Sequence, residues 1–166
     1  MCAFTASIIL SAITAYTNSL SQSSISNRRI ENSIFTKDIA GTGLLINQLS
    51  LLGTDNFSVL VPKLIQNEKD SYLKTQIISS ISNCPYDPNQ TIINSLDILL
   101  KTTNSKKSSL LISICDATYE ICRFMGRPVL YSHGMNMLTQ LLYPQYDLSV
   151  QEHARETLKK ISQLKI

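Results

Sequence analysis

Apolar residues in the second half of the chain recur at spacings of three and four, the period of an α-helix. Short polar breaks divide this pattern into six segments. Their inward positions are, in order, Phe57, Leu60, Val61, Leu64 and Ile65; Leu73, Ile77, Ile78 and Ile81; Ile92, Ile93, Leu96, Leu99 and Leu100; Leu110, Leu111, Ile114, Cys115, Tyr119, Ile121, Cys122 and Met125; Met137, Leu138, Leu141 and Leu142; and Val150, Ala154, Leu158 and Ile161. Since none of these segments shows the two-residue alternation of a strand, the sequence predicts an all-α fold.

Turn residues predict where some helices begin and end. In the loop NCPYDPNQ, Asp87 is the expected N-cap of the third helix, Pro88 its first residue and Gln90 its third. Gly126 suits the left-handed position that ends a helix, and Pro128 soon after it is expected to stop the fourth helix. The fifth helix is then expected to run from about His133 to Leu142.

The last helix should be amphipathic, with a narrow apolar side and Lys159 and Lys160 near its end. Ser149, followed three residues later by Glu152, has the spacing of a capping box at its start. Across the six helices, the side chains expected to be nearly fully buried are Ile77, Leu96, Leu99, Ile114, Leu138 and Leu158.

Three segments of the chain resemble one another and follow at similar intervals. LVPKLIQ begins at Leu60, LDILLKT at Leu96 and MLTQLLY at Met137, and each precedes a polar turn and a second helix. Periods of roughly 40 residues are typical of stacked helix pairs, in which neighbouring pairs cover each other's apolar faces.

LVPKLIQNEKDSYLKTQIISSIS and MLTQLLYPQYDLSVQEHARETLKKIS resemble HEAT repeats. The resemblance implies stacked antiparallel helix pairs in an α-solenoid, with residues 1–166 as one α-helical domain. Residues 1–53 would be divergent N-terminal helices, and residues 54–166 about three HEAT-like pairs. Armadillo repeats, which add a third short helix, are the alternative, especially around Val129 to Tyr131. Either family implies a scaffold that binds proteins, and sometimes nucleic acids.

The first charged residue is Arg28, so residues 1–27 carry no charged side chain. Without a basic start or an unbroken apolar run, a secretory signal or membrane insertion is not expected. Organellar import stays open, because residues 1–30 are rich in Ser and contain no acid. Apolar residues surround much of the predicted first helix, so Ile9 and Ile13 are expected to contact a partner subunit or further repeats.

The composition indicates no particular reaction or class of partner. Of 166 residues, 43% are hydrophobic and only 16% charged, and the net charge of +3 is too small to imply nucleic acid or membrane by itself. The four cysteines form no CxxC pair, so we expect buried thiols in a reducing compartment, cytoplasmic or nuclear.

Motifs for catalysis are weak. GTGLLI lacks the third glycine of a dinucleotide site, and His153 with Glu156 is the reverse of the Glu-x-x-His pattern of di-iron bundles. Asp116 and Glu120 share a helix face, but Arg123 and Arg127 nearby favour a surface charge network. We therefore expect no enzyme activity, no cofactor and no metal site.

Two binding hypotheses follow. The favoured one is a protein-interaction scaffold or a subunit of a larger complex. The alternative is a nucleic-acid-binding module, in which a basic strip follows the phosphates. The strip would consist of Lys106, Lys107, Arg123, Arg127, Lys159 and Lys160. Acids on the same helices, among them Asp116 and Glu152, favour a surface of mixed charge and hence the scaffold.

Overall fold

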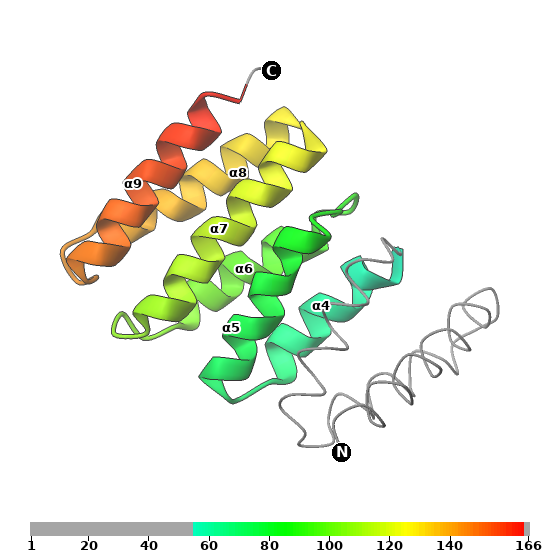
Figure 1. The fold of residues 1–166 in the computed structure, drawn as a ribbon, viewed down its shortest axis with the longest axis horizontal. Helices are drawn as coiled ribbons and strands as arrows, with labels where there is room; N and C mark the ends of the chain where they lie inside the picture. The colour runs from blue at the N-terminus through cyan, green and yellow to red at the C-terminus, as the bar shows by residue number, and fades with distance from the viewer. Residues whose placement is uncertain (1–54, 165–166) are drawn as a thin grey trace, which may run out of the picture. The chain divides into compact units, whose positions relative to one another are not determined.

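A computed structural model of the chain describes residues 55–164, and these residues lie within one compact unit that spans residues 43–166. They form six α-helices, interrupted by two short 3-10 turns, Ile81–Asn83 and Gln140–Leu142 (Figure 1). The helices are α4 (Asp55–Asn67), α5 (Ser71–Ser80), α6 (Thr91–Thr102), α7 (Ser108–Met125), α8 (Pro128–Thr139) and α9 (Leu148–Ser162). The described residues contain no strand, so the predicted all-α class is confirmed for this part of the chain.

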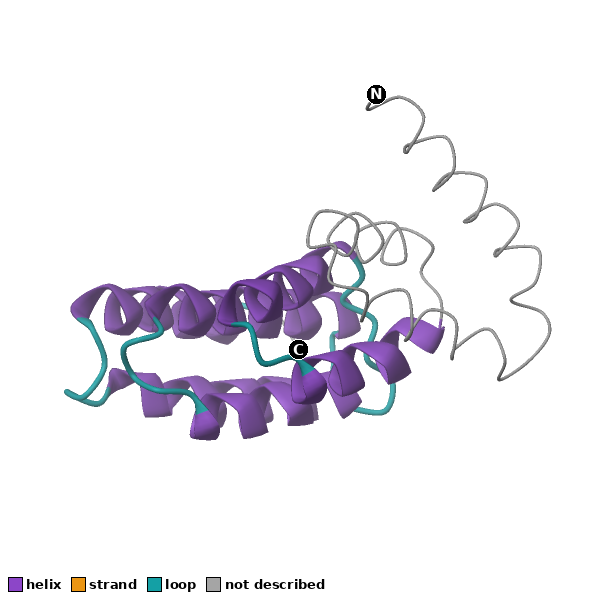
Figure 2. Ribbon diagram, turned by 90° about the horizontal axis from the view of Figure 1, so that it is seen from below, coloured by secondary structure: helices purple, strands orange, loops and turns teal. Residues whose placement is uncertain are grey.

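The helices lie in two layers. Helices α4, α6 and α8 pack side by side in one layer, and α5, α7 and α9 pack side by side in the other (Figure 2). The links 68–70, 103–107 and 140–147 each join a helix of the first layer to its antiparallel partner in the second, so the pairs α4–α5, α6–α7 and α8–α9 follow one another in chain order (Figure 1).

Burial repeats along the first layer. Six of the seven buried positions of α4 recur in α6 with the same spacing, all except Pro62, and five of these six recur in α8. These positions are, in matching order, Phe57, Ser58, Leu60, Val61, Leu64 and Ile65; Ile92, Ile93, Ser95, Leu96, Leu99 and Leu100; and, without a buried match for Ser95, Leu130, Tyr131, Gly134, Met137 and Leu138. Leu64, Leu99 and Met137 are therefore equivalent, which corrects the alignment of Leu60 with Leu96 and Met137.

Two of the three helices of the second layer, α5 and α7, show the same regularity. The buried residues Ile77, Ile78, Ser80 and Ile81 of the α5 region match, in order and spacing, the buried residues Ile114, Cys115, Ala117 and Thr118 of α7.

Hydrogen bonds between successive helix pairs span similar intervals of the sequence. The Thr91 hydroxyl donates to the Ser58 carbonyl oxygen at 2.8 Å over 33 residues, and Arg127 Nη1 donates to the Pro88 carbonyl oxygen at 2.9 Å over 39 residues.

Two of the predicted helix starts are wrong, because the residues that cap these helices do not stand at the predicted cap positions. Helix α6 begins at Thr91, after Gln90 in the left-handed conformation, and the buried Asp87 caps it from outside the helix. Helix α9 begins at Leu148 rather than after Ser149, since the Asp147 carbonyl oxygen already accepts the first helical hydrogen bonds.

The turn between α7 and α8 gives one confirmation and one correction. Gly126 has a φ of 62° and ends α7 as predicted, donating its N–H to the Cys122 carbonyl oxygen. Pro128, however, starts α8 instead of only stopping α7, because a proline at the first helical position needs no hydrogen-bond partner for its nitrogen. Val129 to Tyr131 form the first turn of α8, so these residues do not make the separate short helix of the armadillo alternative.

Five of the six predicted core residues are buried: Ile77, Leu96, Leu99, Ile114 and Leu138. The prediction for Leu158 is wrong, because this side chain is only half-buried and its neighbour Thr157 lies inward at 2% exposure. Leu158 lies about 140° around α9 from His153, which contacts α7. It therefore faces the flank of α9 turned away from α7, where no described helix packs. Four further residues predicted inward, Leu73, Tyr119, Met125 and Leu142, are also half-buried.

Candidate interaction surface

Polar and charged side chains from α7 and α9 meet on the second layer, and we call them the α7–α9 ridge. The ridge consists of Asp116, Tyr119, Glu120, Arg123, His153 and Lys160. His153 Nε2 lies 2.7 Å from Asp116 Oδ1, and the Lys160 ammonium lies 5.8 Å from the centre of the Tyr119 ring. These contacts join the two helices across their outer surface, while the core side chains join them beneath it.

Within α7, the Glu120 carboxylate accepts two hydrogen bonds from Arg123, at 2.9 Å from Nε and 2.6 Å from Nη2. The hydrogen bonds and the charge of Glu120 raise the pKa of the Arg123 guanidinium. The predicted network of carboxylates and arginines is therefore confirmed for Glu120 and Arg123. It is wrong for Asp116, which contacts His153, and for Arg127, which donates to the Pro88 carbonyl oxygen.

The six residues of the predicted basic strip do not come together. Lys106 and Lys107 precede α7, whereas Arg123 lies in its last turn, and a helix of this length separates them by about 24 Å. Helices α7 and α9 run in the same direction (Figure 1), so Lys159 and Lys160 lie toward the Arg123 end. The basic side chains thus form two groups at opposite ends of α7.

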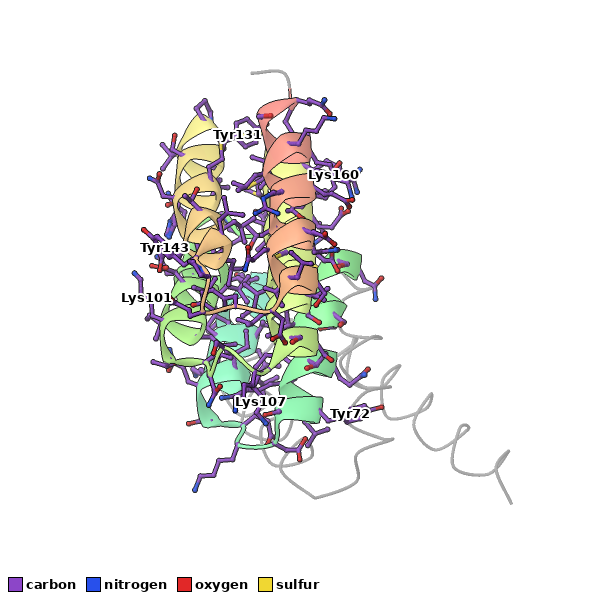
Figure 3. The ribbon with its side chains drawn as sticks, turned by 90° about the vertical axis from the view of Figure 1, so that its left-hand side faces the viewer. Tyr72, Lys101, Lys107, Tyr131, Tyr143 and Lys160 are labelled. Atoms are coloured by element: carbon purple, nitrogen blue, oxygen red, sulfur yellow. The ribbon has the colours of Figure 1, made fainter. Side chains whose placement is uncertain are left out.

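A second polar cluster lies on the first layer, between α6 and α8. Lys101 Nζ contacts Asp97 Oδ2 at 2.7 Å, and His133 Nε2 lies 3.8 Å from the same oxygen. The other carboxylate oxygen of Asp97 is buried and has no hydrogen-bond partner among the described residues. Figure 3 shows Lys101 and Lys160 on opposite faces of the stack, so this cluster is separate from the ridge.

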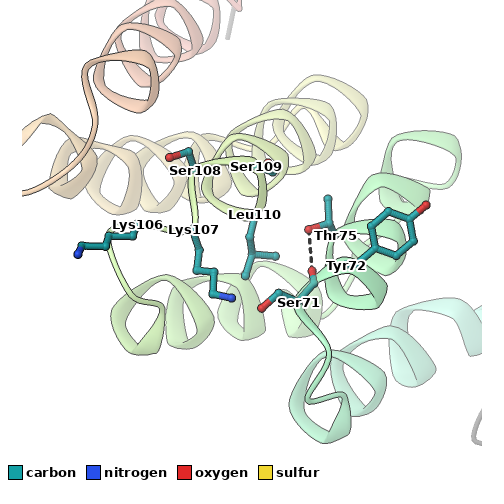
Figure 4. A pocket seen from close by; sticks show the side chains of 8 residues that line it. All are labelled: Ser71, Tyr72, Thr75, Lys106, Lys107, Ser108, Ser109 and Leu110. Carbon is teal, nitrogen blue, oxygen red and sulfur yellow. Dashed lines mark hydrogen bonds between the residues drawn. The ribbon is translucent and has the colours of Figure 1, made fainter.

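A pocket of about 460 Å³ lies at the edge where the turns join the two layers. Its walls come from the start of α5 and from the loop and first turn that open α7 (Figure 4). The lining residues are Ser71, Tyr72, Thr75, Lys106, Lys107, Ser108, Ser109 and Leu110. Two of the residues predicted to bind a partner, Lys106 and Lys107, therefore lie in this pocket, and Arg123 and Arg127 do not.

Several expectations concern reactive groups and the N-terminal segment. Cys84, Cys115 and Cys122 are buried free thiols, as predicted, and burial raises the pKa of each. Residues 55–164 hold no group of His, Cys, Asp and Glu suited to a metal ion, and no helix among them is long and apolar enough to cross a membrane. Ile9, Ile13, Cys2 and the GTGLLI motif lie outside the described residues.

Sequence reasoning missed the contact between Asp116 and His153, although the chain contains a signal for it. The two residues are 37 positions apart, the same interval that separates the matching buried residues Ile77 and Ile114. In stacked pairs, an acid and a base separated by one repeat can face each other across neighbouring helices. The pocket has no comparable signal, because its walls depend on the path of two turns.

Comparison of the chain with protein-family models, with curated proteins and with solved structures gives no match.

Proposed function

We propose that this chain is a non-catalytic protein-interaction scaffold, or a subunit of a larger complex, built as an α-solenoid that resembles HEAT repeats. The observation that carries the proposal is the repeated burial of the helices, which matches Phe57 with Ile92 and Leu130 in the first layer and Ile77 with Ile114 in the second. Repeating units of this kind give an extended surface in which neighbouring helices present side chains in rows. The three buried thiols suit a reducing compartment such as the cytoplasm or nucleus.

The α7–α9 ridge is the part of this surface that we assign to partner binding. It presents acidic and basic side chains and an aromatic ring on two adjacent helices. Asp116 contacts the His153 imidazole, Glu120 pairs with Arg123, and Lys160 lies over the Tyr119 ring. Such alternation suits a protein partner of mixed charge, since complementary charges fix orientation and exclude wrong partners.

The same geometry favours the scaffold over the nucleic-acid alternative. A strip that follows phosphates needs several cations along one continuous path. Here the cations are divided between the two ends of α7, and Arg123 is held by Glu120. A protein surface therefore accounts better for the arrangement of these side chains.

The test starts from the native chain, purified with whatever protein accompanies it, and compares two charge changes. Asp116→Lys alters the ridge, where this side chain is 54% exposed, and Asn136→Lys adds a positive charge at an exposed site on α8. We expect Asp116→Lys to weaken partner binding about tenfold or more and Asn136→Lys to leave it unchanged. A chain that purifies as a lone monomer, or a partner that binds both variants equally, would contradict the proposal.

A further inference from the structure

The pocket between α5 and α7 has a cationic and hydroxyl-rich lining. Two lysines and four hydroxyl side chains of serine and threonine line it, and none of the described residues that line it is acidic. Its volume of about 460 Å³ is in the range of pockets that hold small ligands. The chemistry of these groups indicates that an anionic ligand would fit.

Not all of the polar groups are available to a ligand. The Thr75 hydroxyl donates to the Ser71 carbonyl oxygen at 2.8 Å, and the Ser108 hydroxyl donates to the Asp147 carboxylate. No side-chain hydrogen bond or ion pair holds Lys106, Lys107, Ser71 or Ser109 within residues 55–164. Four potential donors at this pocket thus remain without a partner in that part of the chain.

Two carboxylates next to lining residues, those of Asp70 and Asp147, accept hydrogen bonds. Asp70 accepts hydrogen bonds from the backbone N–H groups of Tyr72 and Leu73, at 2.8 and 2.9 Å, and so caps α5. Asp147 accepts from Ser108. Neither acid forms an ion pair with Lys106 or Lys107, so both ammonium groups are available to a ligand in the described part of the chain.

The direction of the lysine side chains narrows the position of such a ligand. Figure 4 shows Lys107 extending from the start of α7 toward Ser71, whereas Lys106 points away from Ser71. An anion between Lys107 and Ser71 would also lie near the first turn of α7, which has no side-chain cap. The positive end of this helix dipole adds to the attraction of the lysine.

We propose that this pocket binds a phosphate monoester, with Lys107 and Ser71 as donors and Lys106 adding charge at the rim. A phosphate monoester carries a charge of about −1.5 to −2 at neutral pH and three strong acceptor oxygens, which suits a site where a lysine and a hydroxyl donor face each other beside a second lysine. A carboxylate offers only one charge and two oxygens, so it would bind more weakly. The site lies within this chain and does not depend on the scaffold function.

The test uses the full chain labelled with ¹⁵N, in a buffer of low ionic strength so that the attraction is not screened. Three probes are titrated separately: inorganic phosphate, the tripeptide acetyl-Ala-phosphoserine-Ala-amide, and the same tripeptide without phosphate. We expect saturable changes in the amide signals of Ser71 and of residues 107–110 with inorganic phosphate and the phosphotripeptide only.

Variants then assign the binding to the pocket. Lys107→Gln removes the central charge at an exposed position, and Lys159→Gln makes the same change on an exposed part of α9. We expect Lys107→Gln to weaken phosphate binding about tenfold or more, as for loss of one charge-assisted contact, and Lys159→Gln to leave it unchanged. Circular dichroism of both variants checks that the helices are retained.

The source of the phosphate follows from the two phosphate-bearing probes. Tighter binding of the phosphotripeptide than of inorganic phosphate would support a phosphate carried on a peptide, and equal binding would support the free anion. The proposal is overturned if neither of these probes gives saturable changes at the pocket, if the unphosphorylated tripeptide binds equally well, or if Lys107→Gln binds as the wild type does.

Discussion

The Asp87 carboxylate accepts a hydrogen bond from the backbone N–H of Ile93, six residues further along the chain, at 2.9 Å. Asp87 is fully buried, and its second oxygen lies 3.3 Å from the Thr91 hydroxyl. Gln90, the residue at the N-cap position of α6, adopts a left-handed conformation and makes no side-chain cap. The loop thus folds back so that Asp87 satisfies an N–H group that the helix itself leaves unpaired.

Replacing this carboxylate tests its contribution to stability. Asp87→Ala leaves the Ile93 N–H without its acceptor in a buried position, so we expect the free energy of unfolding to fall by about 1–3 kcal/mol. Urea denaturation monitored by circular dichroism measures the change. Asn89→Ala, on the exposed part of the same loop, is the control and should change stability by less than about 0.5 kcal/mol. An equal effect of the two variants would show that Asp87 does not act as the cap.

Gly134 marks a close approach of α8 to α7. A β-carbon added to Gly134 would lie 2.9 Å from the Thr118 Cγ2 atom and 3.1 Å from the Cys122 sulfur. Alanine favours a helix over glycine by about 1 kcal/mol, but here the overlap with a stiff, buried threonine should outweigh that gain. We expect Gly134→Ala to lower the free energy of unfolding by about 1–3 kcal/mol, measured by urea denaturation.

A double-mutant cycle separates this overlap from other effects. Thr118→Ser removes the Cγ2 methyl group and keeps the hydroxyl, which donates to the Ile114 carbonyl oxygen. We expect Gly134→Ala to cost less in the Thr118→Ser background than in the wild type, giving an interaction energy between the two sites. Stabilisation by Gly134→Ala in the wild type would contradict the close packing of the two helices.

The apolar faces of α4 and α6 could be predicted because helical periodicity places their apolar residues on one side of each helix. Every residue predicted inward in α4 and α6 is buried. The helix starts were harder, because Asp87 acts from six residues away and a proline such as Pro128 can either stop one helix or begin the next. On the candidate surface, the charged residues could be named from their spacing but their partners could not, since the Asp116–His153 contact depends on how α9 lies against α7.

In the last helix, α9, the burial of a side chain depends on which neighbouring helices cover it, and substitutions of Leu158 and Ile161 test this. Leu158 is half-buried and lies on the flank that no described helix covers, whereas Ile161 is 1% exposed and within reach of α8. We expect Ile161→Ala to cost about 2–5 kcal/mol, as for other core truncations such as Ile77→Ala, and Leu158→Ala to cost about 1 kcal/mol or less. Urea denaturation of the three variants measures how far each lowers the free energy of unfolding. An equal loss for Leu158→Ala and Ile161→Ala would contradict the assignment of Ile161 to the buried face of α9 and of Leu158 to its uncovered flank.

The buried thiols of α7 predict how stability depends on alkaline pH. Burial raises the pKa of Cys122 from its ordinary value of 9.0 to about 12, and burial together with the nearby Asp116 carboxylate raises the pKa of Cys115 to about 12. Above pH 9 the unfolded chain therefore releases protons that the folded chain keeps. The stability from these thiols is full below pH 9 and falls as the pH rises toward 12.

Each thiol should contribute a slope of about −1.4 kcal/mol per pH unit in this range. Other groups titrate there too, so the comparison is between the wild type and Cys122→Ala, which lacks one of these thiols. Urea denaturation at several pH values between 8 and 10.5, in the presence of a reductant, gives the free energy of unfolding of both proteins. We expect the Cys122→Ala curve to fall less steeply than the wild-type curve above pH 9, by about 1.4 kcal/mol per pH unit. Parallel curves would show that the Cys122 thiol ionises as readily in the folded chain as in the unfolded one, against its burial between α7 and α8.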